Sequence, residues 1–181
     1  MCHFITLVVP TDDAAAVRTI MERHGRAARP IDNPSIRKVL VDGEHQYLTT
    51  QFHCDCGTAL APRHELAEPI EEMLSKEAAR MKRKGWSEAK IARAIEDRRR
   101  ADARPRHGGS DPDSIELWNA ALLELCEELT LPYAGLFVRF YSGEIATEAF
   151  SASRRDVPRN VPWLSALGTI EPDQVTIFRS N

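Results

Sequence analysis

The stretch HFITLVV, residues 3–9, is the clearest strand in the sequence, and the other elements can be placed outward from it. It is short, rich in β-branched residues and followed by Pro10, which is typical of a buried strand. Thr11 is a suitable N-cap for a helix over 12–24. One face of that helix is apolar, formed by Ala14, Val17, Ile20 and Met21. A strand and an amphipathic helix in succession predict a sheet with a helix packed on it.

Two further strands are predicted at 36–41 (IRKVLV) and 45–52 (HQYLTTQF), and residues 30–34 are predicted to form a loop. Asp42-Gly43 between the two strands is a strong signal for a hairpin turn. If the helix brings the chain back, the first of these strands runs parallel to 3–9 through a right-handed crossover. The hairpin then reverses the second strand, which ends at the edge where 3–9 began.

The rest of the chain predicts more helix, then more strand. Helices are expected after Pro69, from Ser87 to 103, and over 113–130, where apolar residues recur at spacings of three and four. Three more strands are expected after the last helix, at 135–141, 144–150 and 174–178. Residues 153–163, between the last two of these strands, are expected to form a loop.

Together these elements predict a single α+β domain over residues 1–181. Its mixed sheet of about five or six strands is covered on one side by the 12–24 and 113–130 helices. Residues 69–107 form a projecting two-helix basic hairpin within that domain. Residues 104–113 (RPRHGGSDPD), rich in Gly and Pro, form a flexible link.

The topology predicts that three of the four cysteines meet. Cys2 lies at the start of the first strand, while Cys54 and Cys56 follow the end of the strand 45–52. The sequence therefore predicts these three thiols on one rim of the sheet. Cys126, beside the apolar stripe of the 113–130 helix, is predicted to be a core residue instead.

Three thiols need one more donor to form a Cys₃His zinc site, so Zn²⁺ is the expected metal. His3, His53 and His64 are candidates for the fourth ligand. His3 and His53 each adjoin a cysteine, and neighbours in an extended strand point to opposite faces. His64 has no such constraint, so the predicted ligands are Cys2, Cys54, Cys56 and His64. The ion would join the N-terminus to the 53–64 loop, in a structural or recognition role.

Two other interpretations of the cysteines stay open. They can be small buried residues, or they can be reactive or disulfide-forming thiols, with Cys2 or Cys56 as the nucleophile of a thiol enzyme. The start Met1-Cys2 resembles class II glutamine amidotransferases, which implies that the amine of Cys2, freed by removal of Met1, would activate its own thiol. That resemblance covers two residues, and His3-Phe4 stands where that family has glycine-rich sequence. A non-enzymatic role is preferred.

The charge is unevenly distributed. Residues 76–107 carry twelve basic and five acidic residues, a net charge of +7, and the whole chain has −3, so the remainder has −10. We expect the basic hairpin to dock on the acidic 113–130 helix in preference to nucleic acid, or to bind a protein partner. An interaction protein, such as an antitoxin-like or immunity-like inhibitor, is the second function class.

The sequence predicts no membrane segment. No apolar run approaches the length of about 20 residues that a spanning helix needs. The stretch FITLVV is short, lacks a preceding Lys or Arg, and runs into Pro10, unlike a secretion signal. A cytoplasmic location is therefore expected, where cysteines beside histidines favour metal binding over disulfides.

Overall fold

The computed structural model describes residues 2–51, 53–61, 70–103 and 113–180 of the chain. The chain divides into two compact units, which are described separately. Unit 1 comprises residues 1–62 and 113–181, and unit 2 comprises residues 63–112. The predicted boundaries of a single domain, of the hairpin excursion and of the flexible link stay predictions.

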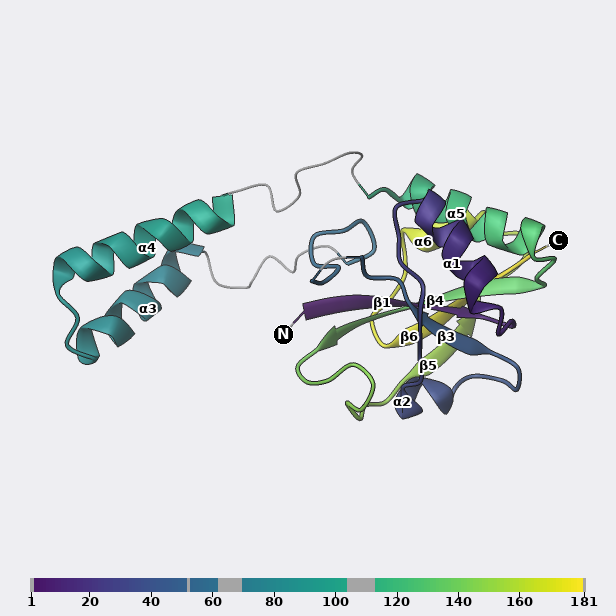
Figure 1. Ribbon diagram of the computed structural model, residues 1–181, viewed down its shortest axis with the longest axis horizontal. Helices are drawn as coiled ribbons and strands as arrows, with labels where there is room; N and C mark the ends of the chain where they lie inside the picture. Colours follow the sequence, from purple (N-terminus) through teal and green to yellow (C-terminus); the bar gives the residue numbers. More distant parts are fainter. Residues whose placement is uncertain (1, 52, 62–69, 104–112, 181) are drawn as a thin grey trace. The chain divides into compact units, whose positions relative to one another are not determined.

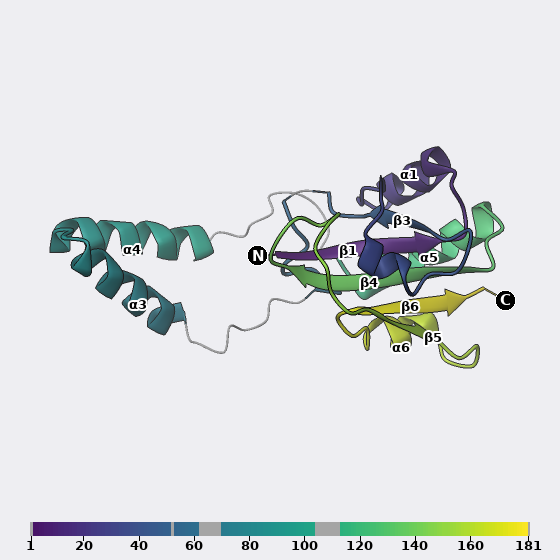
Figure 2. The same cartoon turned by 90° about the horizontal axis from the view of Figure 1, so that it is seen from below.

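Unit 1 contains one six-stranded sheet in the order β2-β3-β1-β4-β6-β5 (Figures 1 and 2). Every neighbouring pair is antiparallel except β5 and β6, so the sheet is mixed and the predicted α+β class is confirmed. β1 is an inner strand, paired with β3 on one side and β4 on the other. The strands are β1 (Cys2–Val9), β2 (Arg29–Ile31), β3 (His45–Leu48), β4 (Tyr133–Tyr141), β5 (Ser153–Asp156) and β6 (Gln174–Arg179).

One face of the sheet carries three helices: α1 (Ala14–Arg23), α5 (Ile115–Glu128) and α6 (Trp163–Leu167). Their buried side chains form the main core with Ile5 and Leu7 of β1. The expected cover by the 12–24 and 113–130 helices is confirmed, although Asp13, and not Thr11, caps α1. Ser114 caps α5.

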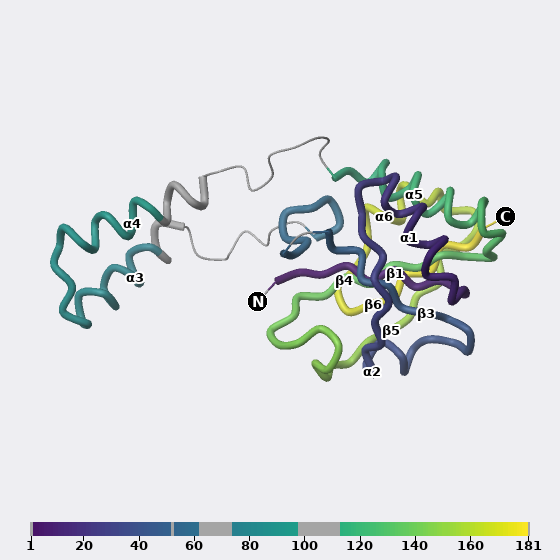
Figure 3. The backbone as a smooth tube through the Cα atoms, viewed as in Figure 1, coloured from purple at the N-terminus to yellow at the C-terminus, as the bar shows by residue number. Residues whose placement is uncertain are grey.

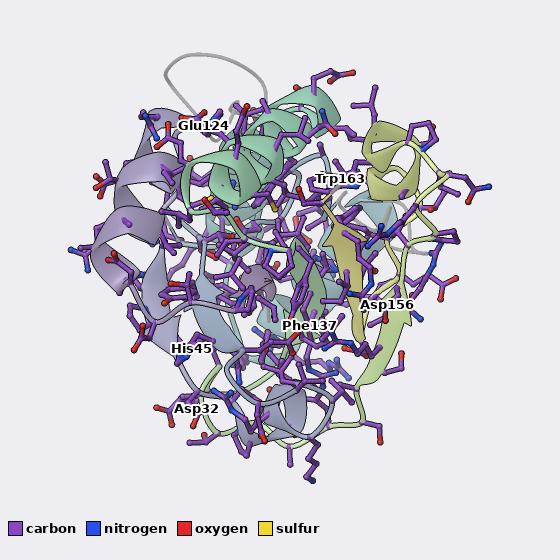
Figure 4. All side chains as sticks on the ribbon, turned by 90° about the vertical axis from the view of Figure 1, so that its right-hand side faces the viewer. Asp32, His45, Glu124, Phe137, Asp156 and Trp163 are labelled. Carbon is purple, nitrogen blue, oxygen red and sulfur yellow. The ribbon has the colours of Figure 1, made fainter. Side chains whose placement is uncertain are left out.

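The opposite face carries a smaller apolar cluster under α2 (Pro34–Arg37). Phe137 of β4 belongs to this cluster together with Ile36 of α2. In Figure 4, Glu124 lies on the side of α5, Asp32 lies beside α2, and Phe137 lies between them. The sheet is therefore buried on both faces, more deeply under α1 and α5.

The predicted strand 36–41 is wrong. Asn33 accepts hydrogen bonds from the backbone amides of Ser35 and Ile36, at 2.7 and 3.3 Å, and Pro34 occupies the first helical turn. A capped N-terminus with proline at its first position favours a helix, so α2 forms here. The expected loop 30–34 instead contributes to β2, and no crossover strand separates β3 from β1.

The predicted strand 144–150 is also wrong. The Glu148 carboxylate accepts hydrogen bonds from the backbone amides of Ser142 (2.9 Å) and Gly143, which folds the segment into turns. Arg139 holds the same carboxylate at 3.0 Å. The expected loop 153–163 contains β5 and the start of α6. Local hydrogen bonds to a side chain thus replace a strand ladder.

Unit 2 contains α3 (Ile70–Arg83) and α4 (Glu88–Ala103), close to the predicted helices. Gly85 lies in the turn between them with φ +79°, a backbone conformation that favours glycine. Leu74 of α3 is buried. Across the described ranges, no helix combines the length and the apolar character needed to cross a membrane.

Candidate metal centre

The loop after β3 lies beside the first residues of β1 (Figure 3). β1 and β3 are antiparallel, with Thr6 opposite Leu48 and Val9 opposite His45, so the chain leaves β3 toward the start of β1. The backbone amide of Asp55 donates to the carbonyl of His3 at 2.8 Å, which extends this pairing into the loop. The predicted rim therefore exists. It forms because β3 pairs directly with β1, whereas the sequence predicted a crossover through a strand at 36–41.

The sulfur atoms of Cys2, Cys54 and Cys56 all lie within 4.8 Å of one another. The prediction that these three thiols meet is confirmed, and the cluster is close enough to hold a metal ion. All three residues are half-buried and none forms a disulfide. Cys126 is buried in the main core, as predicted.

Asp55, between the two loop cysteines, points into the protein and is 1% exposed. Its carboxylate accepts hydrogen bonds from the backbone amide of Ile5 (2.9 Å) and from the Thr50 hydroxyl. Cys54 and Cys56, on either side of this inward carboxylate, are half-buried, and their sulfurs lie close to that of Cys2. The loop is thus fixed by a buried carboxylate, in addition to the contact that the Cys56 sulfur makes with β1.

Arg26 completes this anchor. Its guanidinium pairs with the Asp55 carboxylate, lies 3.8 Å from the Asp113 carboxylate, and is 4.6 Å from the centre of the Trp118 ring. Asp113 also accepts from the backbone amide of Ala59 at 3.3 Å. Removing one carboxylate would leave the buried cation without full compensation, which is costly. The loop is therefore attached to both β1 and the start of α5.

His3 is in contact with the cluster. Its backbone amide donates to the sulfur of Cys56 at 3.1 Å, and its Nδ1 lies 3.7 Å from the same sulfur. Its ring packs edge-on against Phe140, with centroids 4.8 Å apart. His53 is exposed. His64, the predicted fourth ligand, lies outside the described residues.

The surroundings keep two of these thiols protonated in the absence of a metal. Burial raises the pKa of the Cys2 thiol, and its hydrogen bond with Cys54 raises it further. Burial raises the pKa of Cys56 to about 11, although the His3 amide acts in the opposite direction. A cation at the cluster would reverse this balance, because thiols bind metals as thiolates.

Sequence reasoning missed Arg26 and Asp55, the residues that position the loop. The pattern Cys-Asp-Cys did carry a signal, because an acid between two rim residues of an extended segment must face inward. The sequence contained no signal for Arg26, the partner of Asp55, because the two residues are 29 positions apart. No family model, no curated protein and no solved structure matches this chain.

Proposed function

We propose that this chain is a zinc-binding protein whose Cys2, Cys54 and Cys56 thiolates hold one ion at the rim of the sheet. The observation that carries the proposal is the mutual approach of three sulfurs within 4.8 Å. Zinc ligands at about 2.3 Å in a tetrahedron place neighbouring sulfurs about 3.8 Å apart. Shifts of about 1 Å in half-buried side chains would therefore complete the site.

Two features support a metal in preference to inert packing. The hydrogen bond from the His3 amide to the Cys56 sulfur favours the thiolate over the thiol. The inward turn of Asp55 directs both loop cysteines to the place where Cys2 lies. Three thiolates are soft ligands that suit zinc, but they would also bind other thiophilic cations.

The fourth donor is a histidine in this proposal. His64 is the choice from the sequence, whereas His3 is the described histidine in contact with the cluster. A tetrahedral zinc ion places a ligating nitrogen about 3.5 Å from each sulfur, and His3 Nδ1 lies 3.7 Å from that of Cys56. Separate His3→Asn and His64→Asn variants distinguish the two, because losing the true ligand lowers zinc affinity and removes nitrogen ligation.

The ion would have a structural or recognition role. Asp55 already attaches the loop to β1 and Arg26, so the metal mainly fastens Cys2, at the end of β1 opposite Tyr141, to the loop. It would also fix the exposed His53 and Gly57 on the loop surface. The cytoplasmic location, expected from the sequence, belongs to this proposal.

Metal content and free-thiol count, measured on one sample purified without a metal-binding tag, test the proposal. We expect about one zinc per chain, one readily accessible thiol equivalent or fewer before chelation, and four thiols after chelation and unfolding. A Cys126→Ser control should keep the zinc. A protein without zinc that also fails to bind added Zn²⁺ or Co²⁺ would overturn the proposal.

A thiol enzyme is the less favoured alternative. A pKa of about 11 at Cys56 leaves about one thiolate in 10⁴ near neutral pH, which works against a nucleophile there. Rapid alkylation of Cys2 or Cys56 by iodoacetamide in the metal-free protein would favour the enzyme instead. The interaction-protein hypothesis concerns a different surface of the chain.

A further inference from the structure

The last turns of α3 and the residue after it carry a dense group of basic side chains. Residues 76–84 contain five basic residues and one acidic residue. All five side chains are exposed, and we call them the α3 patch: Lys76, Arg80, Lys82, Arg83 and Lys84. Lys82 lies 3.8 Å from Glu88, but both are largely exposed, so this ion pair contributes little.

Three members of the α3 patch border a hollow. Lys76, Lys82 and Arg83 line an open depression of about 480 Å³, together with Ala79. The small side chain of Ala79 leaves space between longer cationic ones. An anion that enters this hollow can meet donors from two successive turns of one helix.

From this patch we infer that unit 2 binds the phosphate backbone of nucleic acid, independently of base sequence. A duplex presents one negative charge per about 1.7 Å of its axis, so a row of exposed cations can neutralise several phosphates and release their counterions. The patch offers such a row along α3. This function is separate from zinc binding at the rim of unit 1.

Part of the negative charge of the 113–130 segment is offset by basic side chains of unit 1. Arg23 of α1 pairs with Glu124 at 2.9 Å and with Glu128 at 2.7 Å, and His24 contacts Glu124 at 2.6 Å. Asp113 lies beside Arg26. The 113–130 segment, on which the hairpin was expected to dock, contains five acidic residues, and Asp113, Glu124 and Glu128 therefore have partners in their own unit.

The described side chains of unit 2 favour nucleic acid over a membrane or an acidic protein. Leu74 is buried and Ala78 and Met81 are half-buried, so these apolar side chains of α3 are not exposed as anchors for a membrane or a protein. Trp86 is the exposed large apolar residue of its described part, and Lys90 lies 4.1 Å from the centre of its ring. Protein interfaces rely on buried apolar or aromatic anchors, whereas phosphate contacts do not.

The test is fluorescence anisotropy of a short, labelled, random-sequence DNA duplex titrated with the full chain. We expect binding at about 50 mM salt and a loss of at least about tenfold in affinity by 200 mM, since two phosphate contacts alone predict that much. The Lys82→Gln/Arg83→Gln variant should lower affinity several-fold at 50 mM and make the salt dependence shallower. A second, unrelated duplex should bind equally well.

The matched control is Arg18→Gln/Arg159→Gln, which removes the same charge from exposed positions of unit 1. It should bind nearly as the wild type does. Three results would overturn the inference: no binding at 50 mM salt, an equal loss in the control, or binding to phosphatidylserine vesicles without binding to DNA. Zinc content is measured separately, so failure here leaves the metal proposal intact.

Discussion

The cysteine loop, residues 53–61, and the α3 patch both concentrate chemistry in a short segment, but their charges lie in different surroundings. In the loop, the Asp55 carboxylate is 1% exposed and has partners on β1, at Thr50 beyond the end of β3, and on Arg26. In the patch, the side chain of Lys82 is 73% exposed, and that of its ion-pair partner Glu88 on α4 is 91% exposed. Separating a buried charge from its partner costs much more free energy than separating exposed charges. The charge of Asp55 therefore holds the irregular loop more firmly than the exposed charges of the patch hold α3.

The largest expected effect comes from Asp55→Ala. The substitution leaves Arg26 buried beside Trp118 with only the more distant Asp113, and uncompensated buried charge costs about 3–5 kcal/mol. Denaturant unfolding monitored by tryptophan fluorescence measures this loss. Zinc affinity should fall as well, because the cysteines lose their direction. A cost below about 1 kcal/mol would mean that the loop is held by other contacts.

The buried carboxylate of Glu44 tests whether buried charges outside the cysteine loop also stabilise the fold more than exposed charges do. Glu44 is fully buried and accepts two hydrogen bonds from Arg154, at 2.8 and 2.9 Å. We expect Glu44→Gln to cost about 2 kcal/mol at neutral pH, since hydrogen bonds to charged groups contribute about that much. Asp32→Asn, in the exposed pair with Arg37, is the control and should change little.

The same pair predicts a pH dependence. Burial alone would raise the pKa of Glu44, but hydrogen bonds from Arg154 and the Val41 amide lower it below its ordinary value. Stability from a carboxylate with a lowered pKa is complete above the unfolded-state pKa of about 4.3 and is lost as the pH falls through the folded-state value. The difference in stability between wild type and Glu44→Gln should therefore shrink below about pH 4.3 in acid titrations. A difference that grows there would contradict the assigned ionisation.

A smaller effect is expected from the cysteines. Cys54→Ser and Cys56→Ser should each release zinc and lower the melting temperature of the zinc-loaded protein, since a bound ligand stabilises the fold that binds it. Without zinc, both should lie within about 1 kcal/mol of the wild type, because Asp55 still anchors the loop. Cys126→Ser should cost about 1–2 kcal/mol in the core with zinc retained. Equal behaviour of all three variants would favour ordinary packing.

The smallest effect is expected from the patch. Lys82→Gln removes one exposed charge and a long ion pair, so the free energy of unfolding should change by less than about 0.5 kcal/mol. Its effect should appear in DNA binding instead. A substantial loss of stability would mean that the patch has partners within the chain.

Local signals were sufficient where they acted within a single element. The apolar run of β1, the stripes of α1 and α5, and the turn at Gly85 each depend on residues a few positions apart. They failed at 36–41, where the cap at Asn33 and Pro34 outweighed a β-branched run, and at 144–150, where Glu148 bound the backbone of the preceding turn. In both places a polar side chain satisfied backbone groups that a strand would otherwise pair.

The sequence by itself determined the α+β class, the four longer helices (α1, α3, α4 and α5) and which cysteines approach one another, because the cysteines lie at the ends of strands whose direction follows from chain reversal. The tertiary structure alone decided that β3 pairs directly with β1 and that Arg26 meets both Asp55 and Asp113. These two acids are 29 and 87 residues from Arg26. No local pattern encodes such a contact, because it depends on where the packed elements bring buried charges together.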